Sequence, residues 1–558
     1  MAQDREKYLT PSGGRTAKAC ANAATLILLI IALALQWRAA RFLLANSLEN
    51  DEPKHFTSGV MVFDYLRKGL PSHPVQFAES FEVRYPLVAI GRWPPMYYAV
   101  QGVFYFLAGP FIRSARVLSA LTAACLALTI FLGLRARAGA RIAAIAAAVF
   151  LAMPLLQDAA WRVMSDLLTA LFVFFAVLAL SKLLDDPDNG RAAIGFAASA
   201  IAAILTKGSA WALVPFLFLA PLLSRRSRFF SSRWFLGALL LVIILGSSFY
   251  LVAARWGIGY PTHFPLYLTE NVGHRLWMLK QALRFAPAPL IALSVAGGLI
   301  ALHARWRRAD DSAPITLSLV AAAWVVSQLV FLLVLPMTSE PRVLLPSLAP
   351  AMVLMARTLQ WLGGALRNKP VLAMMLPAIL GIIVVVDAGA IPRERTDGYR
   401  QAADAMPYPP DGALILIATN IGEQQVLTER LSHDRAHRDV ILRGSHVLGR
   451  VDITGHDQPL FSSAEAMRSY LLQMPVRFVV LNSPPYQFYY QTLIEAAVTG
   501  DPQDFHLISR VPAVDTRDQR SAELLIYENP AGRDHHPSAV RTPLGYDAGR
   551  RILEYQWK

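Results

Sequence analysis

The chain has 558 residues, of which 55% are hydrophobic and only 16% are charged, and its mean hydropathy is +0.39. A soluble protein of this length would divide into several domains, each with a polar surface. Apolar segments near twenty residues long recur along this chain instead, which is typical of a protein that crosses a bilayer many times. This pattern excludes an ordinary soluble enzyme.

The net charge of +14 does not indicate nucleic-acid binding. The Arg and Lys residues lie mainly at the ends of the apolar segments, where membrane proteins place cytoplasmic anchors. The two cysteines, Cys20 and Cys125, lie within apolar segments, so they supply neither a disulfide framework nor metal-ligand spacing. We therefore expect membrane lipid, and no nucleic acid, as a partner.

Eleven apolar segments are predicted to be membrane-spanning helices. Several are shorter than the roughly 20 residues that a straight span needs, so they must recruit flanking residues or lie where the bilayer is thinned. No small-residue cleavage site follows the first segment, so we expect a retained span and not a signal peptide. The predicted spans are Ala19–Trp37, Val117–Leu134, Ile142–Leu156, Leu167–Leu184, Ala192–Leu205, Ala210–Leu223, Trp234–Ala253, Ala286–Leu302, Ile315–Pro336, Val343–Leu362 and Val371–Val386.

The orientation of these spans follows from the basic residues of the short loops. With the N-terminus in the cytoplasm, the Arg-rich loops 135–141, 225–233 and 305–308 all lie on the cytoplasmic side. The opposite short loops hold isolated cations only, namely Arg162, Lys207 and Arg342. This asymmetry predicts a protein of the cytoplasmic (inner) membrane whose C-terminal part is extracytoplasmic.

The segment Pro94–Ile112 is apolar enough to be a further span. A span here would reverse every later loop and place the Arg-rich loops outside. We therefore expect a helix that lies along the external membrane surface, started by the pair Pro94 and Pro95. A re-entrant segment is the alternative.

Residues 392–558 are predicted to form a soluble α/β domain, and residues 1–391 a transmembrane domain with a long external loop over 38–116. Apolar β-rich runs alternate with helical patterns in the C-terminal part, which favours a parallel or mixed sheet covered by helices. Ser462 and Glu465 fit a capping box, and the residues from about 530 onward carry turn formers and charge. The expected strands are Ala413–Ala418, Asp439–Leu442, Phe478–Leu481, His506–Ser509 and Leu524–Tyr527, and the expected helices are Glu423–Ser432, Ala464–Gln473 and Tyr486–Ala497.

Adjacent carboxylates open the first external loop, immediately after a span. Asp51 and Glu52 could be solvated loop residues, or they could supply a general base beside the head group of a membrane-bound substrate. A third acid, Asp166, lies at the mouth of a span, where burial is costly unless the acid is used or paired. Pairing with Arg162 one helical turn away is the alternative for Asp166.

Four cations are expected on the same side of the membrane as these acids: Lys207, Arg342, Arg84 and Arg92. Arg and Lys bind phosphate well, Arg through a bidentate fork. Each of them could instead reach lipid head groups by snorkelling. The hypothesis that acids and cations share one cavity rests on their joint placement.

Together these motifs resemble the bacterial members of the GT-C glycosyltransferase superfamily, a group with protein O-mannosyltransferase-like and lipid A aminoarabinose transferase-like enzymes. The resemblance covers most of residues 19–350, and Lys207 between Thr206 and Gly208 is its weakest match. It departs from the family where Trp93 precedes the proline pair and where Val343 follows Arg342. The matching stretches are Asp51-Glu52 with His55 and Gly59, Trp93-Pro94-Pro95-Met96-Tyr97-Tyr98, Pro154 with Arg162 and Asp166, and Arg342-Val343-Leu344-Leu345-Pro346 with Pro350.

The resemblance implies a sugar donor on a polyprenyl phosphate and an acceptor that is a lipid, a polysaccharide or a protein. It implies catalytic roles for Asp51, Glu52 and Asp166, and contacts of Lys207, Arg342, Arg84 and Arg92 with the carrier phosphate. Some relatives use a divalent metal, so Asp166 and Glu52 are candidates for holding one, although no metal ligand set is predicted. A transporter or lipid flippase, and an inactive membrane scaffold, are the alternative functions.

Overall fold

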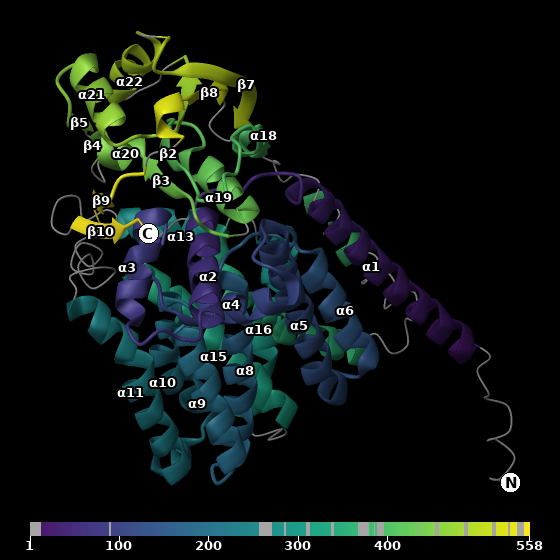
Figure 1. Cartoon of the computed structure of the whole chain (residues 1–558). Helices are drawn as coiled ribbons and strands as arrows, with labels where there is room; N and C mark the ends of the chain where they lie inside the picture. The colour runs from purple at the N-terminus through teal and green to yellow at the C-terminus, as the bar shows by residue number, and fades with distance from the viewer. Residues whose placement is uncertain are drawn as a thin grey trace, which may run out of the picture.

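The computed structural model describes residues 13–88, 91–255, 271–283, 286–307, 313–335, 340–365, 379–383, 386–387, 395–434, 436–451, 457–484, 489–500, 502–515, 520–533, 536–543 and 552–557. A helical bundle forms one end of the molecule, and a smaller sheet-containing domain covers the end of the bundle from which α2 and α3 project (Figure 1). The N-terminal helix α1 leans away from the bundle at its far end. Two parts of different composition therefore meet along one face.

The first 365 residues are helical wherever the structure describes an element. The helices are α1 (Gly13–Leu43), α2 (Glu52–Arg67), α3 (Pro74–Arg84), α4 (Met96–Ala108), α5 (Ile112–Ala138), α6 (Ala140–Ala152), α7 (Pro154–Ala159), α8 (Asp166–Asp185), α9 (Gly190–Ile204), η1 (Gly208–Ala212), α10 (Leu213–Ser224), η2 (Ser227–Ser231), α11 (Arg233–Arg255), α13 (Val272–Leu283), α14 (Ala288–Trp306), α15 (Ala313–Val334), η3 (Pro341–Leu344) and α16 (Leu345–Ala365).

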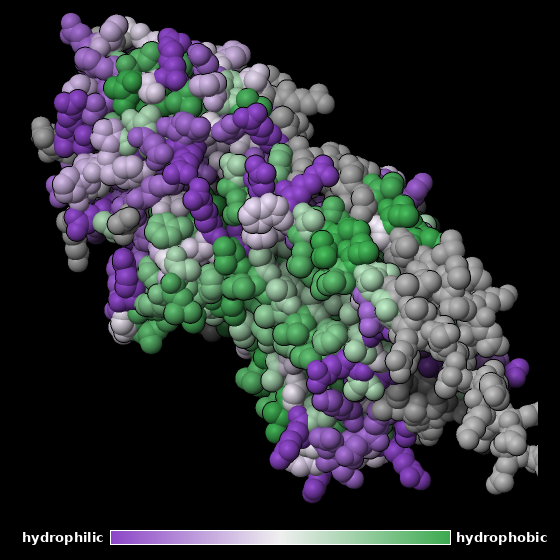
Figure 2. Space-filling model, turned by 90° about the vertical axis from the view of Figure 1, so that its right-hand side faces the viewer, coloured by the Kyte–Doolittle hydropathy of each residue, from purple (hydrophilic) through white to green (hydrophobic). Residues whose placement is uncertain are grey.

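Seven helices within the described residues are long and apolar enough to cross a membrane: Asn22–Leu43, Ile112–Ala138, Asp166–Asp185, Arg233–Ala253, Ala288–Trp306, Thr316–Val334 and Pro341–Ala365. Their outward side chains are apolar too, since Leu240 and Ile243 of α11 are more than half exposed. Figure 2 shows hydrophobic side chains in a band across the middle of one face, with hydrophilic side chains at both ends. The chain is therefore a multi-pass membrane protein.

The predicted spans agree with these helices in most places. Three of them match shorter apolar helices, namely α6, α9 and the stretch Gly208–Ser224. The predicted span 142–156 is divided, because Met153 is extended before Pro154 and the proline begins a new helix, α7. Most of the predicted span 371–386 lies outside the described residues, and the predicted number of eleven spans is not confirmed.

The segment after the proline pair forms the 13-residue helix α4, followed by Gly109 and Pro110 before α5 begins. At about 1.5 Å per residue a helix of this length is much shorter than the hydrocarbon core of a bilayer. The helix agrees with the interpretation of residues 94–112 as something other than a span. Its expected place along the membrane surface stays a prediction.

The C-terminal part contains β1 (Thr396–Asp397), α18 (Tyr399–Asp404), β2 (Leu414–Ala418), α19 (Glu423–His433), β3 (Val440–Arg443), α20 (Gly444–Val447), β4 (Gly449–Val451), β5 (Asp457–Pro459), α21 (Ala464–Gln473), β6 (Phe478–Ser483), α22 (Tyr489–Thr499), β7 (His506–Asp515), β8 (Arg520–Glu528), η4 (Pro530–Gly532), β9 (Ala539–Pro543) and β10 (Ile552–Gln556). Six strands form a mixed sheet of order β1-β7-β8-β6-β2-β3, in which β6, β2 and β3 are parallel and the others antiparallel. The predicted mixed α/β domain is thus present, with each expected strand and helix in place.

Two details of this domain differ from the sequence prediction. Helix α21 begins at Ala464 as expected, but its N-cap is Ser463, which accepts a hydrogen bond from the backbone N–H of Ala466. The predicted capping box of Ser462 with Glu465 is therefore wrong by one residue. Beyond residue 530, where no element was predicted, β9 and β10 pair as an antiparallel ribbon.

The first long loop shares a hydrophobic core with the C-terminal domain. Phe56 and Val60 of α2 and Phe81 of α3 belong to the same buried cluster as Ile415 and Ile417 of β2. A stretch that follows α1 therefore contributes to a core completed some 350 residues later. The proposed domain boundary at 391 and 392 is crossed by this packing.

One close helix contact in the bundle offers a test of the packing. A Cβ atom added to Gly297 of α14 would lie 1.9 Å from the backbone oxygen of Leu354 in α16, whereas one added to Gly298 would lie 3.8 Å from the Cβ of Ala322. We expect Gly297→Ala to lower the thermal stability of the purified protein in detergent by about 1–3 kcal/mol. Gly298→Ala should stay near the wild type, and equal stabilities of the two variants would contradict the observed α14–α16 contact.

Candidate active site

Asp51 is the N-cap residue of α2 and lies in a tight turn formed by residues 49–52. Asn50 adopts a positive φ of 54°, a left-handed conformation that Asn tolerates better than most residues. The turn is closed by the N–H of Glu52, which donates to the carbonyl of Glu49 at 2.9 Å. Helix α2 then presents Asp51, Lys54 and His55 on one side of its first turn, since residues three and four apart share a helix face.

Glu52 connects this turn to the loop before α8 through hydrogen bonds. Its buried carboxylate accepts from the N–H of Val163 at 2.6 Å and from the N–H of Glu49 at 3.0 Å, and lies 3.7 Å from Arg162. Both oxygens of Glu52 are thus occupied by protein groups. The structure does not place Glu52 as an acid free to meet a substrate, and the role that fits its contacts is positioning Asp51.

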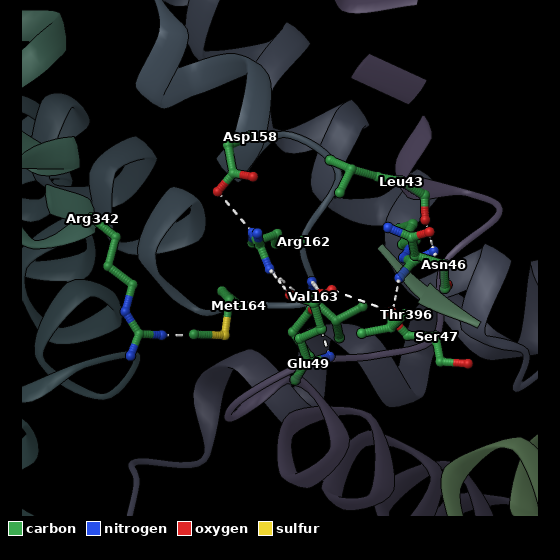
Figure 3. A network of polar contacts seen from close by, with 12 residues as sticks. Leu43, Asn46, Ser47, Glu49, Asp158, Arg162, Val163, Met164, Arg342 and Thr396 are labelled. Atoms are coloured by element: carbon green, nitrogen blue, oxygen red, sulfur yellow. Dashed lines mark hydrogen bonds and ion pairs between the residues drawn. The ribbon is translucent and has the colours of Figure 1, made fainter. Parts of the chain in front are cut away.

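Arg162 is the centre of the surrounding polar network (Figure 3). It contacts Asp158 at 2.7 Å and Glu49 at 3.2 Å, and Glu49 in turn accepts from the hydroxyl of Thr396 at 3.2 Å. Burial by itself would lower the pKa of Arg162, but Asp158 and Glu52 outweigh that effect and raise it. The alternative considered for Asp166, a pairing with Arg162, is absent from the described ion pairs. Arg162 is surrounded by Asp158, Glu49 and Glu52, and Asp166 pairs with Lys207.

Four of the predicted site residues form two ion pairs at the ends of different elements. Arg342 in η3 reaches Asp51 with a 3.2 Å contact, and Lys207, just before η1, reaches Asp166 at the start of α8 with a 2.6 Å contact. Arg342 also contacts the sulfur of Met164, two residues before Asp166, at 3.3 Å (Figure 3). Residues that are more than 290 positions apart in the sequence therefore meet in one cluster.

His55 lies within the reach of all four charges and packs against aromatic side chains. Its Nδ1 atom is 3.0 Å from the hydroxyl of Tyr98, and its ring stacks on Trp93 with a centroid distance of 4.5 Å. Burial, together with the positive charges of Lys207 and Arg342, lowers the pKa of His55 to about 3. The imidazole is therefore neutral at physiological pH.

The carboxyl group of Asp51 is partly open to solvent, with 27% of its side chain exposed. Burial would raise its pKa, but Lys54 and Arg342 outweigh that effect and hold the pKa at about 2. Lys54 lies 3.4 Å from Asp51. Asp51 is thus a charged, accessible carboxylate with two cationic neighbours.

The two remaining predicted cations lie at different places. Arg92 stacks on Trp93 at 5.0 Å, which puts it beside the cluster, next to the ring that covers His55. Arg84 instead donates to the backbone carbonyl of His437 at 2.5 Å and packs on the ring of Tyr555 at 5.6 Å. The structure therefore places Arg84 in the contact with the C-terminal domain, and not with the other predicted site residues.

Three residues of the cluster were quoted in the sequence motifs without being assigned a role there, namely His55, Trp93 and Tyr98, and Lys54 was not singled out. Recognising Pro53 at the first helical positions would have predicted the start of α2. Helical spacing would then have placed Lys54 and His55 on the face of Asp51. The stacking of Trp93 on His55 could not be predicted, because it depends on how α2 and α4 pack.

A divalent metal does not fit the side chains of this site. Among the residues described by the structure there is no group of three or more His, Cys, Asp or Glu side chains with metal-binding geometry. Of the two acids considered for a metal, Glu52 is engaged by backbone N–H groups and Asp166 by Lys207. We derive no step through a metal.

Comparisons with known proteins agree with the arrangement of this bundle. Residues 92–251 match the family described as dolichyl-phosphate-mannose-protein mannosyltransferase. The fold resembles that of ArnT from Cupriavidus metallidurans bound to undecaprenyl phosphate, with a TM-score of 0.55, 15% identity, and coverage of 90% of this chain and 97% of that one. The apo state of the same enzyme gives a TM-score of 0.54 with 16% identity over 90% and 98% of the two chains.

A second fold relative is the oligosaccharyltransferase of Archaeoglobus fulgidus in complex with zinc and sulfate. The TM-score is 0.50 with 12% identity, and the match covers 86% of this chain and 71% of that one. No curated protein matches the sequence. The family match covers only residues 92–251, and the two structural similarities, at 16% identity or less, show that the chain shares their fold.

The lowered pKa of His55 predicts a specific pH dependence of stability. An unfolded His titrates near pH 6.5 and the folded His55 near pH 3, so the unfolded state binds more protons as the pH falls through this window. Because of His55, the wild-type protein should lose about 2 kcal/mol of its free energy of unfolding between pH 7.5 and pH 5. The His55→Asn variant, whose side chain can still bond to Tyr98, should not show this loss.

Chemical or thermal denaturation in detergent at several pH values measures this difference. His506→Asn serves as the control, because His506 is exposed in the C-terminal domain and lies outside the cluster. An unchanged slope in the His55 variant, equal to that of the control, would show that His55 is charged in the folded protein.

Proposed function

We propose that this protein transfers a sugar from a polyprenyl-phosphate carrier to an acceptor at the external face of the cytoplasmic membrane. The observation that carries the proposal is the meeting of Asp51, Asp166, Lys207 and Arg342 in one cluster at the end of the helical bundle. The matched family is named for a dolichyl-phosphate sugar donor, and the related ArnT structure holds undecaprenyl phosphate. Both names support a lipid-linked phosphate as the donor here.

The cluster contains the two kinds of group that such a transfer requires. In the proposed reaction the bond between the anomeric carbon and the carrier phosphate breaks, and a bond from the acceptor oxygen or nitrogen to that carbon forms. The proton of the acceptor goes to Asp51, and the negative charge stays on the departing phosphate. A single displacement of this kind inverts the anomeric configuration.

Arg342 is the cation best placed to stabilise the departing phosphate. It lies at the start of the helical segment of η3 and α16, and its guanidinium already pairs with a carboxylate at 3.2 Å, so an oxyanion fits the same position. Lys207, which contacts Asp166 at 2.6 Å, contributes a second positive charge to the cluster. Preorganised charges of this kind stabilise the transition state, because they do not have to reorient during the reaction.

Arrival of the donor would also activate Asp51. In the free protein Arg342 and Lys54 lower the pKa of Asp51 to about 2, which makes it a weak base. A phosphate that attracts Arg342 weakens this interaction and raises the pKa of Asp51 towards its ordinary value. Asp51 is ionised in both states, but it becomes a stronger base when the donor is bound.

The external position of the cluster and of residues 392–558 is part of the proposal. It is supported by the arginine-rich loops predicted on the opposite side of the membrane. The C-terminal domain covers the end of the bundle at which the cluster lies (Figure 1). We propose residues 1–391 as the catalytic domain and 392–558 as an extracytoplasmic domain that encloses the acceptor side of the site.

Replacement of Asp51 tests the assignment of the base. We expect Asp51→Asn to reduce the release of radiolabelled sugar from polyprenyl phosphate in membranes by about 10²–10³-fold, because the proton acceptor is lost. Asp404→Asn is the matched control, since Asp404 is 47% exposed and pairs only loosely with Arg400 at 3.6 Å. Normal turnover by an Asp51→Asn protein that is present in the membrane at wild-type amounts would refute the assignment.

Replacement of Arg342 tests the phosphate contact separately. Arg342→Gln should weaken donor use strongly, with the donor KM raised and kcat lowered. The cation binds the phosphate in the ground state and binds it more strongly in the transition state, where the negative charge on the departing phosphate grows. Arg342→Lys should recover part of kcat, since a point charge remains but the bidentate fork does not. The matched surface control is Arg510→Gln, whose side chain is 59% exposed. If Arg342→Gln affects the acceptor KM alone, Arg342 does not bind the carrier phosphate.

A further inference from the structure

The order of the parallel strands reverses in the C-terminal sheet. Strand β2 lies between β3, which follows it in the chain, and β6, the next parallel strand. Helix α19, between β2 and β3, packs in the same core as Ile415 and Ile417, whereas α21, between β3 and β6, packs in the same core as Leu414 and Leu416. Alternate residues of a strand point to opposite faces, so the two helices cover opposite faces of the sheet. In open α/β sheets, ligands bind beyond the carboxyl ends of the strands at such a reversal.

Five buried polar atoms near these carboxyl ends have no hydrogen-bond partner among the residues that the structure describes. They are the hydroxyl oxygen of Thr419, Oδ1 and Nδ2 of Asn420, Oε1 of Gln424 and Nδ1 of His446. Thr419 is only 2% exposed. A buried polar atom without a partner lowers stability, and folded proteins contain few of them. Their concentration in one region favours a site at which a ligand supplies the missing partners.

Hydrogen bonds between the strand ends bring these side chains together. The N–H of Asn420, which follows β2, donates to the side-chain oxygen of Asn482 in β6 at 3.0 Å. Glu423 at the start of α19 accepts from the N–H of Ser445, the residue before His446 in α20, at 3.1 Å. The chain segments at the carboxyl ends of β2, β3 and β6 therefore meet at one edge of the sheet.

The chemistry of this edge favours a neutral ligand that is rich in hydroxyl groups. Hydroxyl and carboxamide side chains can both donate and accept hydrogen bonds, as the hydroxyl groups of a sugar do. The adjacent charges balance each other, because Arg443 contacts Glu423 at 2.7 Å. Glu423 is also the first residue of α19, so the helix terminus that would attract an anion already has a carboxylate beside it. A phosphate or carboxylate ligand is therefore disfavoured.

This edge of the sheet lies beside the helix that begins at Asp51. Arg443 donates to the carbonyl oxygen of Pro86 at 3.4 Å, and α19 contacts α2. Figure 1 shows α19 and β3 on the side of the C-terminal domain next to α2. Burial lowers the pKa of His446, and the positive charges of Arg443 and Lys54 lower it further. Since Lys54 also contacts Asp51 at 3.4 Å, the edge is close to the candidate active site.

From this geometry we infer that the carboxyl ends of β2, β3 and β6 bind a neutral sugar residue of the acceptor. Thr419, Asn420, Gln424 and His446 supply the hydrogen bonds to its hydroxyl groups. The binding of a sugar follows from the edge itself, whereas its assignment to the acceptor rests on the proposed function. The C-terminal domain thereby selects the acceptor, and Asp51 and Arg342 act on the transferred group.

Saturation-transfer NMR with neutral sugars tests this site. The probes are glucose, galactose, mannose and N-acetylglucosamine, added to the purified full-length protein in a detergent without a sugar head group. We expect at least one probe to receive saturation from the wild-type protein. In the double variant Asn420→Ala/Gln424→Ala that signal should fall roughly tenfold, because the ligand loses the groups that replace its hydrogen bonds to water.

The matched control for this double variant is Gln473→Ala. Gln473 is exposed at the end of α21 and precedes the start of β6, so it lies at the opposite edge of the sheet. Absence of binding for all four probes, or equal signals from the wild type and the double variant, would overturn the inference. Stronger transfer to glucuronate than to glucose, lost in the double variant, would overturn the assignment of a neutral ligand.

The thermal stability of the free protein gives an independent measurement. Thr419→Val removes a hydroxyl that has no partner among the described residues and keeps nearly the same shape. We therefore expect Tm to be at or above the wild-type value while the sugar signal falls. A clearly lower Tm would show that the hydroxyl serves the fold, and would contradict its place in the sugar site.

The sugar site and the transfer reaction can fail separately. Asp51→Asn leaves the sheet edge unchanged, so this variant should bind the sugar as the wild type does. Sugar binding together with normal turnover by Asp51→Asn would refute the proposed base and leave the sugar site in place. Loss of turnover in Asp51→Asn, with no probe bound by the wild type, would refute the sugar site alone.

Discussion

The arrangement of the candidate active site depends on one buried carboxylate, that of Glu52. It joins the turn before α2 to the loop before α8 by accepting from Glu49 and Val163, and it faces Arg162, which is shared with Asp158 and Glu49. Charge-assisted hydrogen bonds to backbone N–H groups are strong in a buried setting. Because Asp51 precedes Glu52 and Asp166 follows this loop, the network sets the position of both acids at once. Loss of Glu52 would therefore displace two groups that it never touches.

The charges of the cluster are balanced in the protein without a ligand. Asp51 is paired with Arg342, and Asp166 with Lys207. An unpaired charge near the membrane is costly, so internal pairing allows the site to exist without a ligand. The same pairing means that a ligand that competes for Arg342 must itself be anionic, since a neutral group cannot repay the loss of an ion pair. The balance of charge in the free protein and the preference for the proposed anionic donor would thus have one physical origin.

The C-terminal domain is tied to the membrane part in several ways. Its sheet shares a hydrophobic core with α2 and α3, the buried side chain of His437 pairs with Asp64 at 2.9 Å, and Tyr85 donates to Asp434 at 3.0 Å. Thr396 at the beginning of this domain reaches Glu49 of the network around Arg162 (Figure 3). Helix α2, which carries Asp51, is thus packed between two parts of the chain. The C-terminal domain therefore packs against α2 and α3 and helps to hold α2 in place.

Much of the secondary structure was determined by local patterns in the sequence. Apolar runs near twenty residues long have no stable place outside lipid, which is why the helices α5, α8 and α11 were predicted within a few residues. Short β-branched runs between turns likewise marked β2, β6 and β8. Acids and cations at the loop positions of Asp51, Asp166, Lys207 and Arg342 were also recognisable, because such side chains are rare beside apolar spans.

Only the tertiary structure decided what each of these side chains does. Glu52 and Asp51 are neighbours in the sequence. Glu52 is buried and accepts a hydrogen bond from the N–H of Val163, whereas Asp51 is partly exposed beside Arg342. Arg84 was indistinguishable from Arg92 as a loop cation, until packing against His437 and Tyr555 placed it in the contact with the C-terminal domain. Hydropathy and local spacing report where a segment lies. The partner of a charge depends on contacts between residues hundreds of positions apart, and these form only when the helices and the sheet pack together.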